Sequence, residues 1–182
     1  MDEHRARITK DGIRIYEDAD FAGMRAAGRI AAEILDAVTP LVQPGSTTAV
    51  IDDFITAEIK RRGVTSATIG YKGYRHASCI SVNLDVSHGI PGPKVLMDGD
   101  ILNVDVTVIV DGWHGDTSRM YVAGQLARKS ERLIEVTHVG LMRGIAEVKP
   151  GNWLGVIGLA IESYVEAQRR SVVRDFCGHG LG

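Results

Sequence analysis

The sequence predicts an α+β fold made of two similar halves, each a pair of helices followed by an antiparallel sheet. Apolar residues recur at helical spacing in four segments, and segments with the composition of strands lie between the second and the third. The stretch VQPGSTTAVIDDFITAEI, which begins at Val42, also aligns without gaps on VKPGNWLGVIGLAIESYV, which begins at Val148. Such a repeat indicates two halves that stack around a shared core, although two amphipathic helices can also match by coincidence.

The four helices are expected from apolar periodicity and from residues that commonly cap helices. The first follows Asp20 and the second follows Ser46. The third follows Ser130 and the fourth follows Asn152. Strands are expected in ASCISVN (77–83), ILNVDVTVIV (101–110) and TSRMYVAG (117–124).

A tight hairpin is expected between the last two strands. Asp111-Gly112 separates two apolar-rich runs, and this dipeptide favours a two-residue turn with positive φ at both positions. Counting back from that turn places Thr107 opposite Asp116, and Asp105 then shares the face of Asp116 as its diagonal neighbour.

This pair of carboxylates predicts a divalent metal site. Asp105 lies among β-branched residues, where an ionised group is costly to bury unless a positive charge compensates it. Two like charges held together repel each other unless a proton or a cation joins them. The alternative is that both aspartates are solvated, or that Asp116 caps a turn with Thr117 and Ser118.

Composition fits one domain of ordinary size in a reducing compartment. The chain has 182 residues with 45% apolar residues and a net charge of −2, without a basic block, so no nucleic-acid partner is expected. The N-terminal MDEHRARITKDG has no apolar core of a signal peptide, and no apolar run is long enough to span a membrane. Cys79 and Cys177 form no CxxC pattern, as suits a cytoplasmic protein.

The second half of the repeat is expected to be incomplete. The first copy continues through its hairpin to about Gly124, whereas the second stops at Gly182, before an equivalent hairpin. We therefore interpret residues 1–182 as a single catalytic domain that lacks the end of the second repeat. Ile157, Ile161 and Val165 are expected to lack partners, and a strand near VVRDFCGHG is expected to present an unpaired edge that favours self-association.

Four segments in order resemble the type I, bacterial-type methionine aminopeptidases of peptidase family M24. They are GYKGYRHASCISVN, SHGIP, DGDILNVDVTVIVDGWHGDTSRMYVAG and CGHGLG, and the resemblance covers the chain from about residue 10. It implies the duplicated pita-bread fold and metal-dependent removal of the N-terminal methionine from nascent proteins and peptides. It also implies two divalent ions, of cobalt, manganese, iron or zinc.

The resemblance assigns roles to individual residues. Asp105, Asp116 and His179 match metal ligands, with Asp116 bridging both ions. His88 in SHGIP matches the catalytic histidine, which also contacts the substrate near the scissile bond. Taken alone, each histidine would more often be an ordinary loop residue; the order of the motifs favours the functional interpretation.

The methionine pocket is expected from the tyrosine-rich motif. Tyr71, Tyr74 and Cys79 match substrate-binding positions, and Thr107 matches a position close to the metals. Alone, the tyrosines would be core or surface aromatics and Cys79 a small buried hydrophobic residue. His76 and His114 are interpreted as structural or supporting residues.

The sequence departs from the family pattern at its end. The family completes its metal site with two glutamates and adds a second active-site histidine, and all three would lie beyond Gly182. The remaining three ligands are expected to hold one ion weakly. Two hypotheses follow: an aminopeptidase represented incompletely, or a truncated, catalytically impaired or inert relative that binds N-terminal peptides or a partner. Prolidase-like activity is the weaker third, because SHGIP and the tyrosine-rich segment favour methionine removal.

Overall fold

The computed structural model describes residues 7–181 and divides them into two compact units. The first unit comprises residues up to Gly124 together with Leu181, and the second comprises Gln125–Gly180. The expected single domain over 1–182 stays a prediction. The elements of the first unit are β1 (Arg7–Ile8), β2 (Arg14–Ile15), α1 (Asp18–Val38), η1 (Thr39–Leu41), α2 (Thr48–Arg61), β3 (Thr65–Ser66), η2 (Tyr71–Gly73), β4 (Ser78–Val82), β5 (Asp100–Val110) and β6 (Trp113–Ala123). Those of the second unit are α3 (Arg128–Ala146) and α4 (Gly155–Ala167).

Strand β5 is the centre of an antiparallel sheet in the first unit. It pairs with β6 along one edge, and with β3 and β4 one after the other along the opposite edge. The β5–β6 hairpin turns at Asp111 and Gly112, with φ of 49° and 85°, and pairs Val110 with Trp113. The structure therefore confirms the expected hairpin and its register, and β6 begins at Trp113, earlier than the expected strand at 117.

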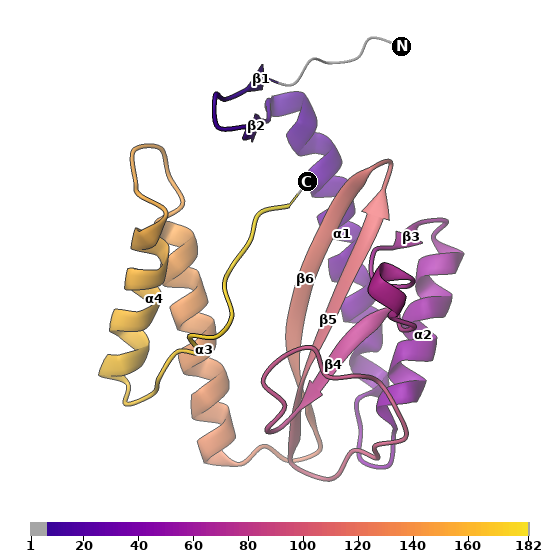
Figure 1. Cartoon of the computed structure of the whole chain (residues 1–182). Coiled ribbons are helices and arrows are strands. Elements are labelled where there is room, and N and C mark those ends of the chain that lie inside the picture. The colour runs from indigo at the N-terminus through magenta and orange to yellow at the C-terminus, as the bar shows by residue number, and fades with distance from the viewer. Residues whose placement is uncertain (1–6, 182) are drawn as a thin grey trace. The chain divides into compact units, whose positions relative to one another are not determined.

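Helices α1 and α2 pack on one face of this sheet (Figure 1). The core joins buried residues of both helices to alternate residues of β5; its members include Ile34, Leu35, Val38, Ile51, Ile55, Leu102, Val104, Val106 and Val108. Each such side chain stabilises the fold by about 1.5–3 kcal/mol through burial. Because the period of a strand is two, the other residues of β5 face away from these helices.

The first two helices begin at residues close to the expected caps. Glu17 is the N-cap of α1, and its backbone N–H donates to the Asp20 carboxylate at 2.8 Å, so Asp20 lies in the first turn and is not the cap. Thr47 caps α2 in place of Ser46, because its hydroxyl accepts from the Val50 N–H at 3.3 Å.

The expected caps of the last two helices are wrong. Ser130 lies inside α3, which begins at Arg128, and Asn152 lies before α4, which begins at Gly155. The Asn152 amide donates instead to the carbonyl and the carboxylate of Glu147, at 3.0 and 2.8 Å. Its side chain therefore stabilises the turn that follows α3.

In the second unit, α4 packs against two glycines of α3. A Cβ added to Gly144 would lie 2.7 Å from Cδ1 of Ile161, and one added to Gly140 would lie 3.2 Å from Cγ2 of Val165. Ile157 also approaches Gly144. The expectation that Ile157, Ile161 and Val165 lack partners is therefore wrong, because the missing side chains of the glycines let the two helices approach closely.

The chain after α4 is irregular. No strand occurs in the described residues 168–181, so the expected strand near VVRDFCGHG, and with it a sheet after the second helix pair, is not present in this part of the chain. Arg174 instead forms ion pairs with Glu162 and Glu166 of α4. Among residues 7–181, no helix combines the length and the apolar character needed to cross a bilayer.

Candidate metal and substrate site

The polar face of the sheet brings the two expected aspartates onto adjacent strands. Thr107 pairs with Asp116, and Asp105 pairs with Ser118. Asp105 and Asp116 thus project from the same face as diagonal neighbours, on the side away from the apolar core. The hydroxyl of Thr107 donates to Oδ1 of Asp116 at 2.9 Å, which restricts the orientation of that carboxylate.

Cys79 extends this polar face onto β4. It pairs with Asp105 across the β4–β5 ladder, and its Sγ lies 3.6 Å from the hydroxyl of Tyr74. Burial raises the pKa of the Cys79 thiol, the hydrogen bond with Tyr74 opposes this, and the negative charges of Asp105, Asp52 and Asp116 raise the pKa further. A thiol that stays protonated is a poor nucleophile, so this environment suits a wall of a binding site.

Tyr74 and Tyr71 occupy different environments. Tyr74 is partly buried and donates to the carbonyl of Ser78 at 2.8 Å, and burial raises the pKa of its hydroxyl, with Cys79 and Asp52 adding to the shift. Tyr71 is 64% exposed, and the ammonium of Lys72 lies 5.4 Å from the centre of its ring. The structure therefore joins Tyr74 to Cys79, whereas Tyr71 lies at the surface of η2.

His88 lies in the loop between β4 and β5, and its backbone is fixed against β4. It has a positive φ of 54°. The next residue, Gly89, donates to Ser81 Oγ at 3.0 Å and accepts from the Ile80 N–H at 2.8 Å. A Cβ at Gly89 would lie 2.2 Å from the Ile80 carbonyl oxygen, so only glycine allows this close approach. The side chain of His88 is exposed.

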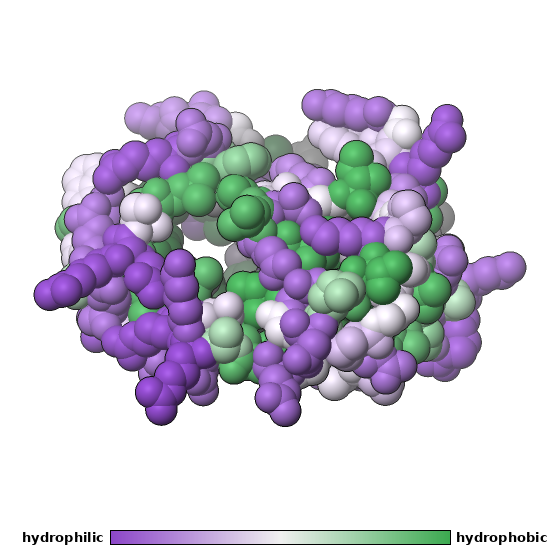
Figure 2. Space-filling model, turned by 90° about the horizontal axis from the view of Figure 1, so that it is seen from below, coloured by the Kyte–Doolittle hydropathy of each residue, from purple (hydrophilic) through white to green (hydrophobic). Residues whose placement is uncertain are grey.

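The loop that carries His88 also exposes apolar side chains. Leu84 is 95% exposed and Ile90 is 71% exposed, and both flank His88 in the chain. The loop lies at the lower end of the first unit in Figure 1, and the view from below in Figure 2 shows apolar residues at the surface among hydrophilic ones. A substrate that reaches His88 would contact both apolar and hydrophilic side chains.

A buried carboxylate on α2 organises the start of β4. Oδ1 of Asp52 accepts from the N–H groups of Ala77 and Ser78 at 3.0 and 2.9 Å, and from Ser78 Oγ at 2.7 Å. Its Oδ2 lies 2.9 Å from Nδ1 of His76, whose ring meets that of Tyr74 edge to face. Asp52 was not among the site residues expected from the sequence. Its position one turn after Thr48, beside the apolar stripe of α2, was the available signal.

His179 belongs to the second unit. It lies in the irregular segment after α4, with Nδ1 3.0 Å from the carbonyl oxygen of Gly180. Among residues 7–181, no three His, Cys, Asp or Glu side chains form a group that could hold a metal ion. Ligation by His179 together with the two aspartates stays a prediction.

The donor chemistry of the polar face fits a divalent cation. Carboxylate oxygens are suitable ligands for manganese and iron, and also for zinc or cobalt. Two carboxylates supplied by a rigid hairpin, one of them oriented by a threonine, provide a preorganised pair of such donors. This pair can hold part of a metal's coordination sphere.

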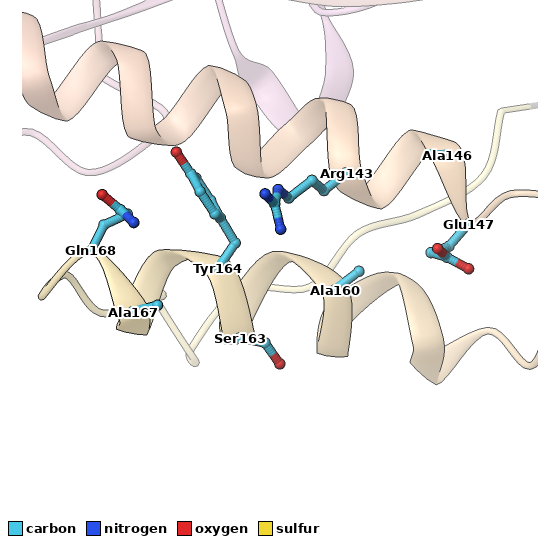
Figure 3. Close-up of a pocket in the computed structure, with 8 residues that line it drawn as sticks. All are labelled: Arg143, Ala146, Glu147, Ala160, Ser163, Tyr164, Ala167 and Gln168. Carbon is cyan, nitrogen blue, oxygen red and sulfur yellow. The ribbon is translucent and has the colours of Figure 1, made fainter.

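A groove in the second unit lies between α3 and α4, and none of the expected site residues lines it. Figure 3 shows Tyr164 of α4 beside Arg143 of α3 in the space between the two helices, and the guanidinium carbon lies 4.3 Å from the centre of the ring. Glu147 and Gln168 lie at its two ends. Among the described residues, the side chains that line this groove form no cluster that could hold a metal ion.

Comparison with known proteins shows the family of the chain. Metallopeptidase family M24 matches residues 22–182. Methionine aminopeptidase of Rickettsia prowazekii is 51% identical over 170 residues, which is 93% of this chain and 66% of the relative. Methionine aminopeptidase A of Synechocystis is 48% identical over 172 residues, or 94% of this chain and 68% of the relative. The chain thus spans slightly less than two thirds of the length of the R. prowazekii relative.

Solved structures show the same fold. The crystal structure of the R. prowazekii methionine aminopeptidase matches with a TM-score of 0.92 at 50% identity, over 93% of this chain and 68% of that one. The Xaa-Pro dipeptidase of Bacillus anthracis matches with a TM-score of 0.75 at 18% identity, over 85% of this chain and 42% of that one. At that identity the second likeness concerns the pita-bread fold alone.

Proposed function

The chain belongs to metallopeptidase family M24, among the bacterial-type methionine aminopeptidases, and on that premise we propose that it supplies the metal- and methionine-binding residues for removing the N-terminal methionine of nascent proteins and peptides. The observation that carries the proposal is the placement of Asp105, Asp116 and Cys79 on one polar face, with Tyr74 hydrogen-bonded to Cys79. Relatives at about half identity are named as methionine aminopeptidases, which does not favour an inert binding protein.

In this proposal, Asp105, Asp116 and His179 hold the divalent ions, with Asp116 oriented by Thr107. When bound, such ions lower the pKa of a water molecule and polarise the scissile carbonyl, so that hydroxide is available near neutral pH. His88 donates a hydrogen bond at the scissile peptide, where negative charge develops. Tyr74 and Cys79, with Tyr71, enclose the methionine side chain, which an apolar, polarisable wall accommodates well.

The finer features of the proposal are two ions of cobalt, manganese, iron or zinc, and a cytoplasmic location. Substrates are peptides and nascent chains that begin with methionine, and we propose no nucleic-acid partner.

Apolar side chains at the surface of α3 support self-association through this helix. They include Leu133, Leu141, Met142 and Ile145, which are 42–52% exposed. Sedimentation over a range of concentrations measures that association.

The test is hydrolysis of Met-Ala-Ser with added manganese or cobalt. Two proteins are assayed: the 182-residue chain, and a hybrid in which the remaining C-terminal part of the R. prowazekii relative follows residue 182. We expect the hybrid to release methionine but not leucine from Leu-Ala-Ser, and the Asp116→Asn hybrid to lose activity by 100-fold or more. A folded hybrid, checked by circular dichroism, that releases no methionine while the R. prowazekii enzyme does would contradict the proposal.

A further inference from the structure

Four buried polar side chains in the described part of the chain hold the segments that carry the proposed catalytic and pocket residues. They are Thr48 (2% exposed), Asp52 (5%), Ser78 (0%) and Ser81 (7%). Two lie on α2 and two on β4. Thr48 and Asp52 are four residues apart in a helix and therefore lie on the same side of it.

Thr48 forms hydrogen bonds with Gly92, which follows His88 in the loop between β4 and β5. Its hydroxyl donates to the carbonyl of Gly92 at 3.0 Å and lies 2.9 Å from the Gly92 N–H, which donates to it. The N–H of Ala49 also donates to the Gly92 carbonyl, at 2.9 Å. Because Ser81 and Ile80 hold Gly89 at the other end, the short segment with His88 is fixed on both sides.

Asp52 fastens the second segment, from Tyr74 to Cys79. Its carboxylate accepts three hydrogen bonds from Ala77 and Ser78 and contacts His76, as described above. The hydroxyl of Tyr74 in turn donates to the carbonyl of Ser78. The position of Tyr74 beside Cys79 therefore depends on Ser78 and His76, which both contact the carboxylate of Asp52.

Stability alone does not explain this choice of residues. A buried hydrogen bond contributes only about 0.5–1.5 kcal/mol net, and a buried carboxylate is often no more stabilising than a well-packed apolar group. A hydroxyl or carboxylate with defined partners does, however, fix the position of those partners, which apolar packing does less precisely. Displacing a catalytic group by about 1 Å can reduce turnover by roughly 100-fold.

We propose that Thr48 and Asp52 are positioning residues of the active site: Thr48 places His88 through Gly92, and Asp52 places Tyr74 and Cys79 through His76 and Ser78. The roles of the positioned residues rest on the proposed function. The hydrogen bonds by which α2 holds the two segments do not depend on the proposed function.

The first measurement is amide hydrogen exchange by NMR on the 182-residue chain, which needs no activity. In Thr48→Val, we expect exchange at Gly89 and Gly92 to accelerate at least 10-fold and the His88 ring signal to shift, with Ala77 and Ser78 unchanged. Thr48→Ser keeps the hydroxyl and should restore parental exchange. In Asp52→Ala, we expect exchange at Ala77 and Ser78 to accelerate at least 10-fold, with Gly89 and Gly92 unchanged.

Two further variants separate positioning from stability. Asp52→Asn keeps an acceptor for Ala77 and Ser78, so it should shift the signals of His76 and Tyr74 while leaving those two amides protected. Val38→Ala removes methyl groups from the core of α1 and lowers global stability without touching either segment. This variant should leave the exchange rates of Gly89 and Gly92, relative to those of Ala77 and Ser78, unchanged.

The second measurement is the hydrolysis assay on the hybrid. Thr48→Val should lower kcat about 10-fold or more with little change in KM, since it displaces His88, whereas Asp52→Ala should mainly raise KM, since it displaces the pocket. Exchange that accelerates equally at all four amides in every variant, in proportion to lost stability, would overturn the inference. A parent hybrid without hydrolysis would overturn the proposed function instead, and the exchange pattern would still decide the positioning.

Discussion

Thr107 on β5 and Asp116 on β6 lie directly opposite each other, and the threonine hydroxyl donates to the aspartate at 2.9 Å. The register matters, because a shift by one residue would turn Asp116 toward the apolar core. It also leaves Asp105 on the same face as Asp116. The two proposed metal ligands are therefore positioned by a turn at Asp111-Gly112.

The first prediction concerns the orientation of Asp116. Thr107→Val should weaken divalent metal binding about 10-fold, because partners that orient a ligand contribute to metal affinity. Thr107→Ser, which retains the hydroxyl, should bind nearly as well as the parent. Isothermal calorimetry with manganese measures both variants; equal affinity of the valine variant and the parent would show that this hydrogen bond does not influence the metal.

The second prediction concerns the contact between α1 and β6. A Cβ at Gly115 would lie 2.2 Å from the carbonyl oxygen of Ala27, a backbone atom, so Gly115→Ala should lower the free energy of unfolding by about 1–3 kcal/mol. The matched control is Gly28→Ala on α1, where a Cβ meets nothing within 4 Å. That change should stabilise the helix by about 0.5–1 kcal/mol. Urea unfolding compares them, and the same sign for both changes would refute the assigned close approach.

The third prediction concerns the pocket. Methioninamide should shift the NMR signals of Tyr71, Tyr74 and Cys79 more than alaninamide does, because in the proposed function these residues contact a side chain as long as that of methionine. Tyr164, which lies in the groove of the second unit, serves as an internal reference. If both ligands shift the three signals equally, the residues have a structural role only.

The hairpin register and the helices could be predicted from sequence because their signals are local. Asp-Gly has few alternatives to a turn with positive φ, and both residues adopt it here. The helix ends were less predictable, since Ser46 and Thr47 are both suitable caps and only the observed bond to Val50 distinguishes them. The strand expected near VVRDFCGHG had suitable composition, but no partner strand pairs with it among the described residues.

The hydrogen-bond partners of Asp52 were not predictable by the same reasoning. An aspartate on an amphipathic helix is usually solvated, and its partners at Ala77 and Ser78 are distant in the sequence. His76 was expected to be structural or supporting, and its contact with Asp52 agrees with this. Contacts between distant segments require the tertiary structure, whereas turns and periodicity do not.

The fourth prediction concerns acid stability. Hydrogen bonds from Arg61 and then from Arg62 lower the pKa of Glu58 to about 2, although burial opposes this, from an ordinary value of 4.5. Because the folded-state pKa is lowered, the ionised Glu58 stabilises the protein above about pH 4.5, and this contribution is lost as the pH falls toward 2. The unfolding free energies of the parent and Glu58→Gln should therefore differ most near neutral pH and converge in acid.

The control for this prediction is Glu135→Gln, in a pair with Arg132 in which both side chains are more than half exposed. Exposed pairs contribute little, so this variant should follow the parent at every pH. Thermal unfolding between pH 2 and 7 measures all three proteins. A difference between the parent and Glu58→Gln that grows toward low pH would contradict the assigned direction of the shift.

The most direct test of the metal site is calorimetry of manganese binding to the 182-residue chain and to two variants of the hairpin. We predict that Asp116→Asn weakens binding 10-fold or more, since it removes the charge of a proposed ligand. Asp111→Asn, at the exposed turn of the same hairpin, removes an equal charge and suits the positive φ there, so it should bind as the parent does. Equal affinity of the parent and both variants would contradict the assignment of the polar face as a metal site.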